Sequence, residues 1–144
     1  TLKWLKDHKI PIGILTRNTH SNASAVAEKH NLEFDAIFDR HDGPVKPDPF
    51  GVKKLCKFFK VKPEQTLVVG DYLFDLQSAK AAGAKAVLIR AGANAEKFGS
   101  FADYIIDSLT EIIDIIKQNS ELRPLKNYDL ENHRLPRPAL QASQ

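Results

Sequence analysis

The chain has 144 residues, of which 42% are hydrophobic and 27% are charged, and its formal net charge at pH 7 is +3. This composition suits one soluble α/β domain with a single core. The lysine and arginine residues are spread along the chain, so no basic block indicates a nucleic-acid partner. No apolar run is long enough to cross a membrane and no signal peptide is visible, so we expect no membrane partner.

Cys56 is the only cysteine, which excludes an internal disulfide and a cysteine-rich metal site. It fits a reducing compartment, so we expect an intracellular, cytoplasmic location, with an organelle as the alternative. The chain begins with Thr1 and contains no methionine. The sequence therefore leaves three interpretations of this chain open: a fragment, a processed form or an incomplete gene model.

The first half of the chain is predicted to alternate helices with strands. In chain order, apolar spacing favours a helix already under way at residue 1, a strand over residues 10–15, a helix over 21–30 and a strand over 34–38. The buried side of the second helix is expected to carry Ala23, Val26 and Ala27.

A third helix is expected after residue 48, with Asp48 as its N-cap and Pro49 at its first position. Cys56 falls on the apolar side of this helix, so we interpret it as a core residue rather than a reactive thiol.

The second half continues the alternation. Its pattern predicts a buried strand over residues 66–69, a helix closed by Gly83, a strand over 86–89, a short edge strand over 104–106 and a helix over 109–117. Strands that alternate with helices imply a parallel sheet. Residues 1–118 are thus expected to form the core domain. Residues 119–144 are polar and non-periodic, which indicates a disordered C-terminal tail.

Two aspartates follow the predicted strand over residues 66–69. Asp71 stands just beyond its carboxyl end, where open α/β sheets bind ligands, and Asp75 comes four residues later in the first turn of the helix. Two carboxylates that converge there repel each other unless a cation lies between them, and an all-oxygen site suits Mg²⁺. The alternative is structural, because aspartate also favours turns and helix N-caps.

Three loops are expected at the same edge of the sheet, and they carry Thr16, Lys46 and the pair Asp71 and Asp75. Phosphoryl transfer needs a hydroxyl that orients phosphate oxygens, a cation that offsets their charge and carboxylates that hold a metal. Those are the groups present.

The segments that carry these groups resemble the haloacid dehalogenase superfamily, and within it the phosphoglycolate-phosphatase-like members. Residues 12–16 (Ile-Gly-Ile-Leu-Thr) are similar to the family's second motif, 46–49 (Lys-Pro-Asp-Pro) to the third and 70–75 (Gly-Asp-Tyr-Leu-Phe-Asp) to the fourth. The resemblance runs from about residue 1 to residue 118, and three motifs in the right order are more specific than any one.

The resemblance implies a three-layer, Rossmann-like parallel sheet with helices on both faces. It also implies a Mg²⁺-dependent hydrolase, a phosphatase of small phosphate monoesters whose partner is a small phosphorylated metabolite. Thr16 and Lys46 would be catalytic and would bind the phosphoryl group, and Arg17 and Asn18 would lie within reach of the substrate. The residues that would hold the metal are Asp71 and Asp75.

The chain departs from the family at the first motif, the Asp-x-Asp that supplies the nucleophile and the general acid. No Asp-x-Asp is present, and the nearest acidic cluster, residues 39–43, belongs to the loop before Lys46. In the family the missing segment also contains the central first strand and commonly a cap. We therefore expect a gap between the strands at residues 10–15 and 66–69, with unpaired backbone groups.

Two classes of function follow. The first is a phosphatase that is active only in the intact protein, so that this chain alone is inactive. The second is a non-catalytic, phosphate- or metal-binding regulatory pseudoenzyme. A response-regulator-like receiver is less favoured, since its acidic pair should follow the first strand rather than a later one.

Overall fold

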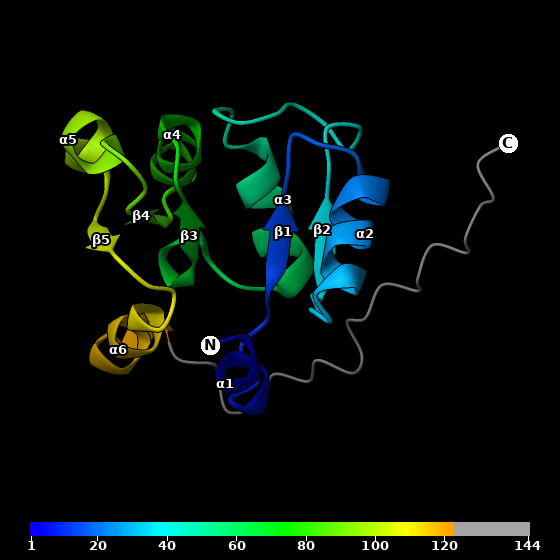
Figure 1. Ribbon diagram of the computed structural model, residues 1–144, viewed down its shortest axis with the longest axis horizontal. Helices are drawn as coiled ribbons and strands as arrows, with labels where there is room; N and C mark the ends of the chain where they lie inside the picture. Colours follow the sequence, from blue (N-terminus) through cyan, green and yellow to red (C-terminus); the bar gives the residue numbers. More distant parts are fainter. Residues whose placement is uncertain (123–144) are drawn as a thin grey trace, which may run out of the picture.

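The computed structural model describes residues 1–122, in which six α-helices alternate with five strands (Figure 1). In chain order the elements are α1 (Leu2–Asp7), β1 (Gly13–Leu15), α2 (His20–Lys29), β2 (Ala36–Phe38), α3 (Phe50–Phe59), β3 (Leu67–Gly70), α4 (Leu73–Ala82), β4 (Lys85–Ile89), α5 (Asn94–Phe98), β5 (Tyr104–Ile106) and α6 (Glu111–Gln118).

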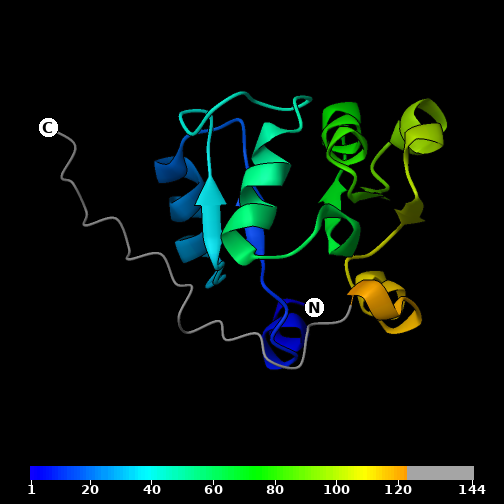
Figure 2. The same ribbon diagram turned by 180° about the vertical axis from the view of Figure 1, so that it is seen from behind.

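All strand pairs are parallel, as the alternation of helices and strands predicted. β1 pairs with β2 in a two-stranded sheet, with Gly13 opposite Ala36. The other sheet has the order β3-β4-β5, so that β5 is the predicted edge strand. β1 and β3 lie in different sheets although they run side by side in the same direction, with the expected gap between them (Figures 1 and 2).

Helices cover both faces of the β3-β4-β5 sheet, which confirms the layered α/β fold. Successive side chains of β4 point to opposite faces, as strand geometry requires. Ala86 and Leu88 pack in one cluster with residues of α3 and α4, whereas Val87 packs in another with residues of α1 and α6. The sheet therefore lies in the middle of two apolar layers.

Cys56 lies in the first of these clusters and is 3% exposed, which confirms that it is a core residue. Burial raises the pKa of its thiol, so at neutral pH it is a poor nucleophile. The predicted end of α4 is also confirmed, because Gly83 has a φ of 85° in the left-handed region that favours glycine.

Three details differ from the sequence prediction. The strand expected from residue 10 begins only at Gly13, since Pro11 has no N–H and the N–H of Ile12 donates to Oδ2 of Asp35. Val26, expected to be buried, is 57% exposed, because α2 covers a sheet of only two strands. The N-cap of α3 is Pro49 rather than Asp48.

The polar tail predicted from residue 119 lies mostly outside the described residues. Of the residues that are described, Ser120–Leu122 form a 3₁₀ turn in which Leu122 is buried against the α6 layer. None of the helices within residues 1–122 has the length and apolar character that a membrane span requires.

Candidate functional site

The carboxyl ends of β1 and β3 face the same edge of the molecule (Figure 1). The loops that follow them, together with the loop before α3, surround an open depression of about 340 Å³. It contains all six residues that the sequence singled out, with two aromatic residues that it did not: Thr16, Arg17, Asn18, Lys46, Asp71, Tyr72, Phe74 and Asp75.

The centre of the depression is an ion pair between Lys46 and Asp75. Nζ of Lys46 lies 2.5 Å from Oδ1 of Asp75, and their side chains are only 15% and 13% exposed. The same ammonium donates to the carbonyl of Leu15 at 3.3 Å. Lys46 thus joins the end of β1 to the first turn of α4 and fixes a positive charge between them.

Asp75 reaches this position because its neighbours leave room for it. Its second oxygen, Oδ2, accepts the N–H of Tyr72 at 3.2 Å, which closes the turn between β3 and α4. Gly70 lies so close to this carboxylate that any Cβ there would collide with it. The Gly-Asp sequence at the end of β3 is therefore a packing requirement as well as a motif.

The hydroxyl of Thr16 is oriented by the backbone. Its Oγ1 accepts the N–H of Asn18 at 3.0 Å, and the N–H of Thr16 donates to the carbonyl of Phe38 at the end of β2. Because Oγ1 acts as an acceptor here, its own hydrogen remains available for an oxygen of a ligand.

Asn18 has a structural role at the start of α2. Its Oδ1 accepts the N–H of Thr19 at 2.8 Å and Nδ2 of Asn22 at 2.9 Å, while Thr19 caps the helix. This network gives the loop after β1 a defined shape next to Thr16.

Arg17 and two aromatic side chains form the outer part of the depression. The Arg17 guanidinium lies 5.4 Å from the centroid of the Phe74 ring, within the range of a cation–π contact. Tyr72 is 51% exposed and packs edge-on against Phe74. This end of the site can therefore contact a group that is planar, anionic or both.

The acidic residues fit Mg²⁺ as part of a coordination shell. Asp71 is exposed, and no hydrogen bond or ion pair to its carboxylate is found within residues 1–122. Asp75 is already paired with Lys46, and no group of three potential metal-binding side chains occurs among the described residues. Mg²⁺ commonly binds one or two carboxylates and completes its octahedron with water and phosphate oxygens, so this donor set suits it.

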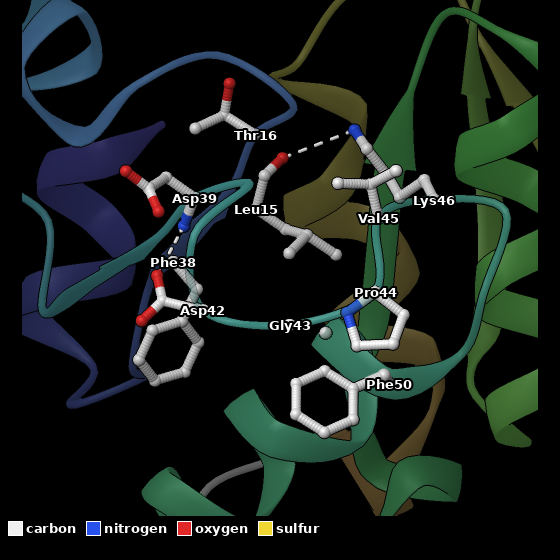
Figure 3. Close-up of a pocket in the computed structure, with 11 residues that line it drawn as sticks. Leu15, Thr16, Phe38, Asp39, Asp42, Gly43, Pro44, Val45, Lys46 and Phe50 are labelled. Atoms are coloured by element: carbon white, nitrogen blue, oxygen red, sulfur yellow. Dashed lines mark hydrogen bonds between the residues drawn. The ribbon is translucent and has the colours of Figure 1, made fainter.

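The acidic cluster at residues 39–43 lies beside the site, next to a second, much smaller pocket (Figure 3). Oδ1 of Asp39 accepts the N–H of His41, and Oδ2 accepts that of His20 at the start of α2. Burial raises the pKa of Asp39, but these two hydrogen bonds and the charge of His41 outweigh it and hold the pKa below its usual value. Both oxygens of Asp39 are therefore engaged in the structure of this loop and of the start of α2.

Asn94 was not singled out from the sequence, yet its buried side chain donates to the carbonyl of Asp71 at 2.9 Å. It begins the five-residue helix α5, in a stretch for which the sequence predicted neither a helix nor a strand. The available signal was an asparagine two residues after Gly92, a pattern typical of turns as well as helix starts.

Comparison with known proteins identifies relatives of this chain. Residues 1–89 match the family of haloacid dehalogenase-like hydrolases. The chain is 35% identical over 130 residues to a glyceraldehyde 3-phosphate phosphatase of Pyrococcus furiosus, covering 83% of this chain and 53% of that protein. It is 35% identical over 90 residues to a phosphoglycolate phosphatase of Nitrosospira multiformis, covering 60% of this chain and 40% of that protein.

The fold is also similar to a solved structure, a HAD-superfamily hydrolase of subfamily IA from Geobacter sulfurreducens. The TM-score is 0.68 at 28% identity, and the match covers 80% of this chain and 52% of that chain. This chain thus spans about half the length of the Pyrococcus furiosus and Geobacter sulfurreducens relatives.

Proposed function

Because this chain belongs to the haloacid dehalogenase-like hydrolase family, we propose that it is the phosphate- and metal-binding part of a Mg²⁺-dependent phosphatase of small phosphate monoesters. The observation that carries the proposal is the Lys46–Asp75 pair, which lies in one depression with Thr16 and Asp71 although the four residues come from three separate segments of the chain.

Each residue has a distinct role in this proposal. Thr16 donates its hydroxyl hydrogen to an oxygen of the phosphoryl group, and Lys46 offsets the negative charge on another. Asp71 holds Mg²⁺, and Asp75 binds it directly or through water while it keeps Lys46 in place. Mg²⁺ bound there would supply positive charge that stabilises the transferring phosphoryl group. Arg17, Asn18 and the aromatic residues contact the leaving group.

The proposal also assigns a limit to this chain. An aspartyl nucleophile divides the hydrolysis into two easier steps, and the sequence contains no Asp-x-Asp. Neither Thr16 nor Lys46 is arranged to replace it, because Oγ1 of Thr16 is paired with the N–H of Asn18 and the carboxylate beside Lys46, that of Asp75, is held in the ion pair. We therefore expect the 144-residue chain to bind phosphate without hydrolysing its esters.

The second candidate is a regulatory protein that binds phosphate or metal without catalysis. The missing Asp-x-Asp is the observation in its favour. In either case the expected partner is a small phosphorylated metabolite in the cytoplasm, with neither nucleic acid nor membrane involved.

Thermal unfolding with Mg²⁺ and inorganic phosphate tests the binding roles. A ligand at a hundredfold excess over its Kd stabilises the folded state by about 2.7 kcal/mol, a readily measured rise in Tm. We expect Mg²⁺ to raise the Tm and phosphate to raise it further only when Mg²⁺ is present. Asp71→Asn should abolish the effect of Mg²⁺, and Lys46→Met should abolish the effect of phosphate.

Matched controls separate these roles from general changes in charge. Asp107→Asn removes a carboxylate that follows β5, and Lys54→Met removes a lysine whose ion pair with Asp42 is more exposed. Both should keep the full response. If Asp71→Asn responds to Mg²⁺ as the unsubstituted chain does, the metal site is misplaced and the proposal loses its basis.

A further inference from the structure

Asn94 is one of two polar residues within residues 1–122 that are buried, and it is 8% exposed. Its Nδ2 donates to the carbonyl oxygens of Asp71 and Ile89, each at 2.9 Å. Its Oδ1 accepts the N–H of Ala91, also at 2.9 Å. Both amide hydrogens and the amide oxygen are therefore engaged.

This arrangement requires an amide. If the Asn94 amide were turned over, its oxygen would face two carbonyl oxygens, which cannot donate a hydrogen bond. An apolar side chain of the same size would leave both carbonyls without this partner, and burying an unpaired polar group is costly. The position thus needs two donors and one acceptor at fixed directions.

The two carbonyls lie at the carboxyl ends of neighbouring strands. The β3-β4 ladder ends with Gly70 opposite Leu88, and Asp71 and Ile89 are the residues that follow these two along the chain. Asn94 consequently holds the two strands together one step beyond their own hydrogen bonds. The peptide group that Asn94 fixes is the one between Asp71 and Tyr72. This group is bonded to the Cα atom that carries the Asp71 side chain.

We propose that Asn94 is a positioning residue, which fixes the backbone of Asp71 and so sets the affinity of the site for Mg²⁺. This inference rests on the proposed function, in which Asp71 binds the metal. Beyond Asn94, the described bonds that close this turn join Tyr72 and Asp75: the N–H of Tyr72 donates to Oδ2 of Asp75 at 3.2 Å, and the N–H of Asp75 donates to the carbonyl of Tyr72 at 3.1 Å. Neither of these two bonds is made to the carbonyl of Asp71. Without Asn94 the exposed Asp71 has more orientations, and metal binding has to restrict them.

Two variants and one control test this role in the full chain. Asn94→Ala removes the amide, and Asn94→Leu removes its hydrogen bonds while it keeps the volume. Ala95→Gly is the matched control, because it destabilises the same helix and leaves Asn94 in place. Amide exchange of Tyr72 is followed in metal-free protein, and the Kd for Mg²⁺ is measured by calorimetric titration.

We expect the Kd for Mg²⁺ to rise about tenfold in both Asn94 variants, the lower end of the range for residues that orient metal ligands. The Tyr72 amide should exchange faster in these variants, relative to core amides, than in Ala95→Gly. If the unsubstituted chain binds no Mg²⁺, the proposed function is wrong and the positioning role falls with it. If it binds Mg²⁺ but the Asn94 variants match Ala95→Gly in Kd, only the positioning role is refuted.

Discussion

At Gly70 the backbone of β3 lies directly against the Asp75 carboxyl group. A Cβ atom at this position would lie 2.3 Å from Cβ, Cγ and Oδ2 of Asp75, a distance that atoms in folded proteins do not tolerate. The absence of a side chain lets Asp75 fold back towards the strand end and reach Lys46. The geometry of the charged centre therefore depends on a residue without functional groups.

We predict that Gly70→Ala displaces Asp75 and breaks its ion pair with Lys46. The overpacking should lower the free energy of unfolding by about 1 to 3 kcal/mol. It should also abolish the rise in Tm that phosphate produces in the presence of Mg²⁺. Urea denaturation measures the first effect and thermal unfolding the second.

Gly92→Ala is the matched control for this prediction. Gly92 has a φ of +55°, so alanine is strained there, but no atom lies within 4 Å of the added Cβ. Its cost should be about 1 kcal/mol or more, from the left-handed backbone alone. If both variants lose the phosphate response equally, the close approach of Gly70 to Asp75 is not what supports the site.

At the scale of elements, Asp103 joins α4 to the start of β4. Its Oδ1 lies 2.6 Å from Nζ of Lys80, and its Oδ2 accepts the N–H of Ala86 at 2.7 Å. Burial raises the pKa of Asp103, but the hydrogen bonds from Lys80 and Ala86 and the charges of Lys80 and Lys85 outweigh it. The pKa is consequently below its usual value, 3.8.

This shift predicts how stability depends on pH. A carboxyl group whose pKa is lower in the folded state stabilises the fold above its unfolded pKa and loses that contribution as pH falls through the folded value. Asp103→Asn should therefore cost about 1 to 2 kcal/mol at pH 7, a figure reduced by partial exposure. The difference from the unsubstituted chain should shrink as the pH falls below 3.8, because Asp103 becomes neutral as the pH passes through its lowered folded-state pKa.

Asp107→Asn provides the comparison for Asp103. Its ion pair with Arg90 is more exposed, with Asp107 73% exposed, so the substitution should leave the unfolding free energy nearly unchanged at every pH. A difference between Asp103→Asn and the unsubstituted chain that persists undiminished at low pH would contradict the assigned origin of the shift.

The sequence predicted those elements whose signals are local and strong. The strand that ends at Gly70 was predicted from a continuous apolar run, and it is present. The helix that Gly83 closes was predicted from its glycine terminator, and it is present too. The pattern at residues 10–15 carries the same apolar signal but includes Pro11, and the strand begins later. The convergence of Thr16, Lys46 and Asp71 also followed from parallel topology, because the loops after parallel strands share one edge.

What the sequence did not predict depends on contacts between distant residues. Helix α5 has five residues, fewer than two turns, so it has no periodic pattern to detect. The hydrogen bond from Asn94 to Asp71 joins residues that are 23 positions apart. Tyr72 and Phe74 are aromatic, a residue type that sequence alone assigns to the core. Only the fold shows that they line the depression.

At the scale of the whole molecule, the two sheets present facing edges without a shared ladder. On β1, Ile12 and Thr16 direct their backbone groups towards β2, so Gly13 and Leu15 direct theirs to the other side. No backbone hydrogen bond joins β1 to β3 in the part of the chain that the structure describes. An additional parallel strand placed between the two sheets could form hydrogen bonds with β1 on one side and with β3 on the other.

The same alternation holds on β3. The carbonyl of Thr66 accepts the N–H of Lys85, which directs the even-numbered residues of β3 towards β4. The N–H groups of Leu67 and Val69 therefore face the side of β1, together with those of Gly13 and Leu15. These four amides identify the edges that a further strand would cover.

We predict that the four amides, those of Gly13, Leu15, Leu67 and Val69, exchange rapidly with solvent in the 144-residue chain. They should become protected in an extended chain that places an apolar strand ending in Asp-x-Asp ahead of Thr1, joined through the connecting sequence of the Pyrococcus furiosus relative. Hydrogen exchange followed by NMR measures the protection. The same extended chain should release phosphate from small phosphate esters with Mg²⁺, and Asp71→Asn should abolish that release.

The 144-residue chain should show neither the protection nor the release, because it has both free edges and no Asp-x-Asp motif. Since one inserted strand would supply both the missing ladder and the missing carboxylate, protection and turnover should appear together. Turnover by the 144-residue chain that is lost in Asp71→Asn would place the nucleophile within residues 1–144 and contradict the prediction. Protection without turnover in the extended chain would instead favour the regulatory, non-catalytic class, since the sheet would then be complete and the chemistry still absent.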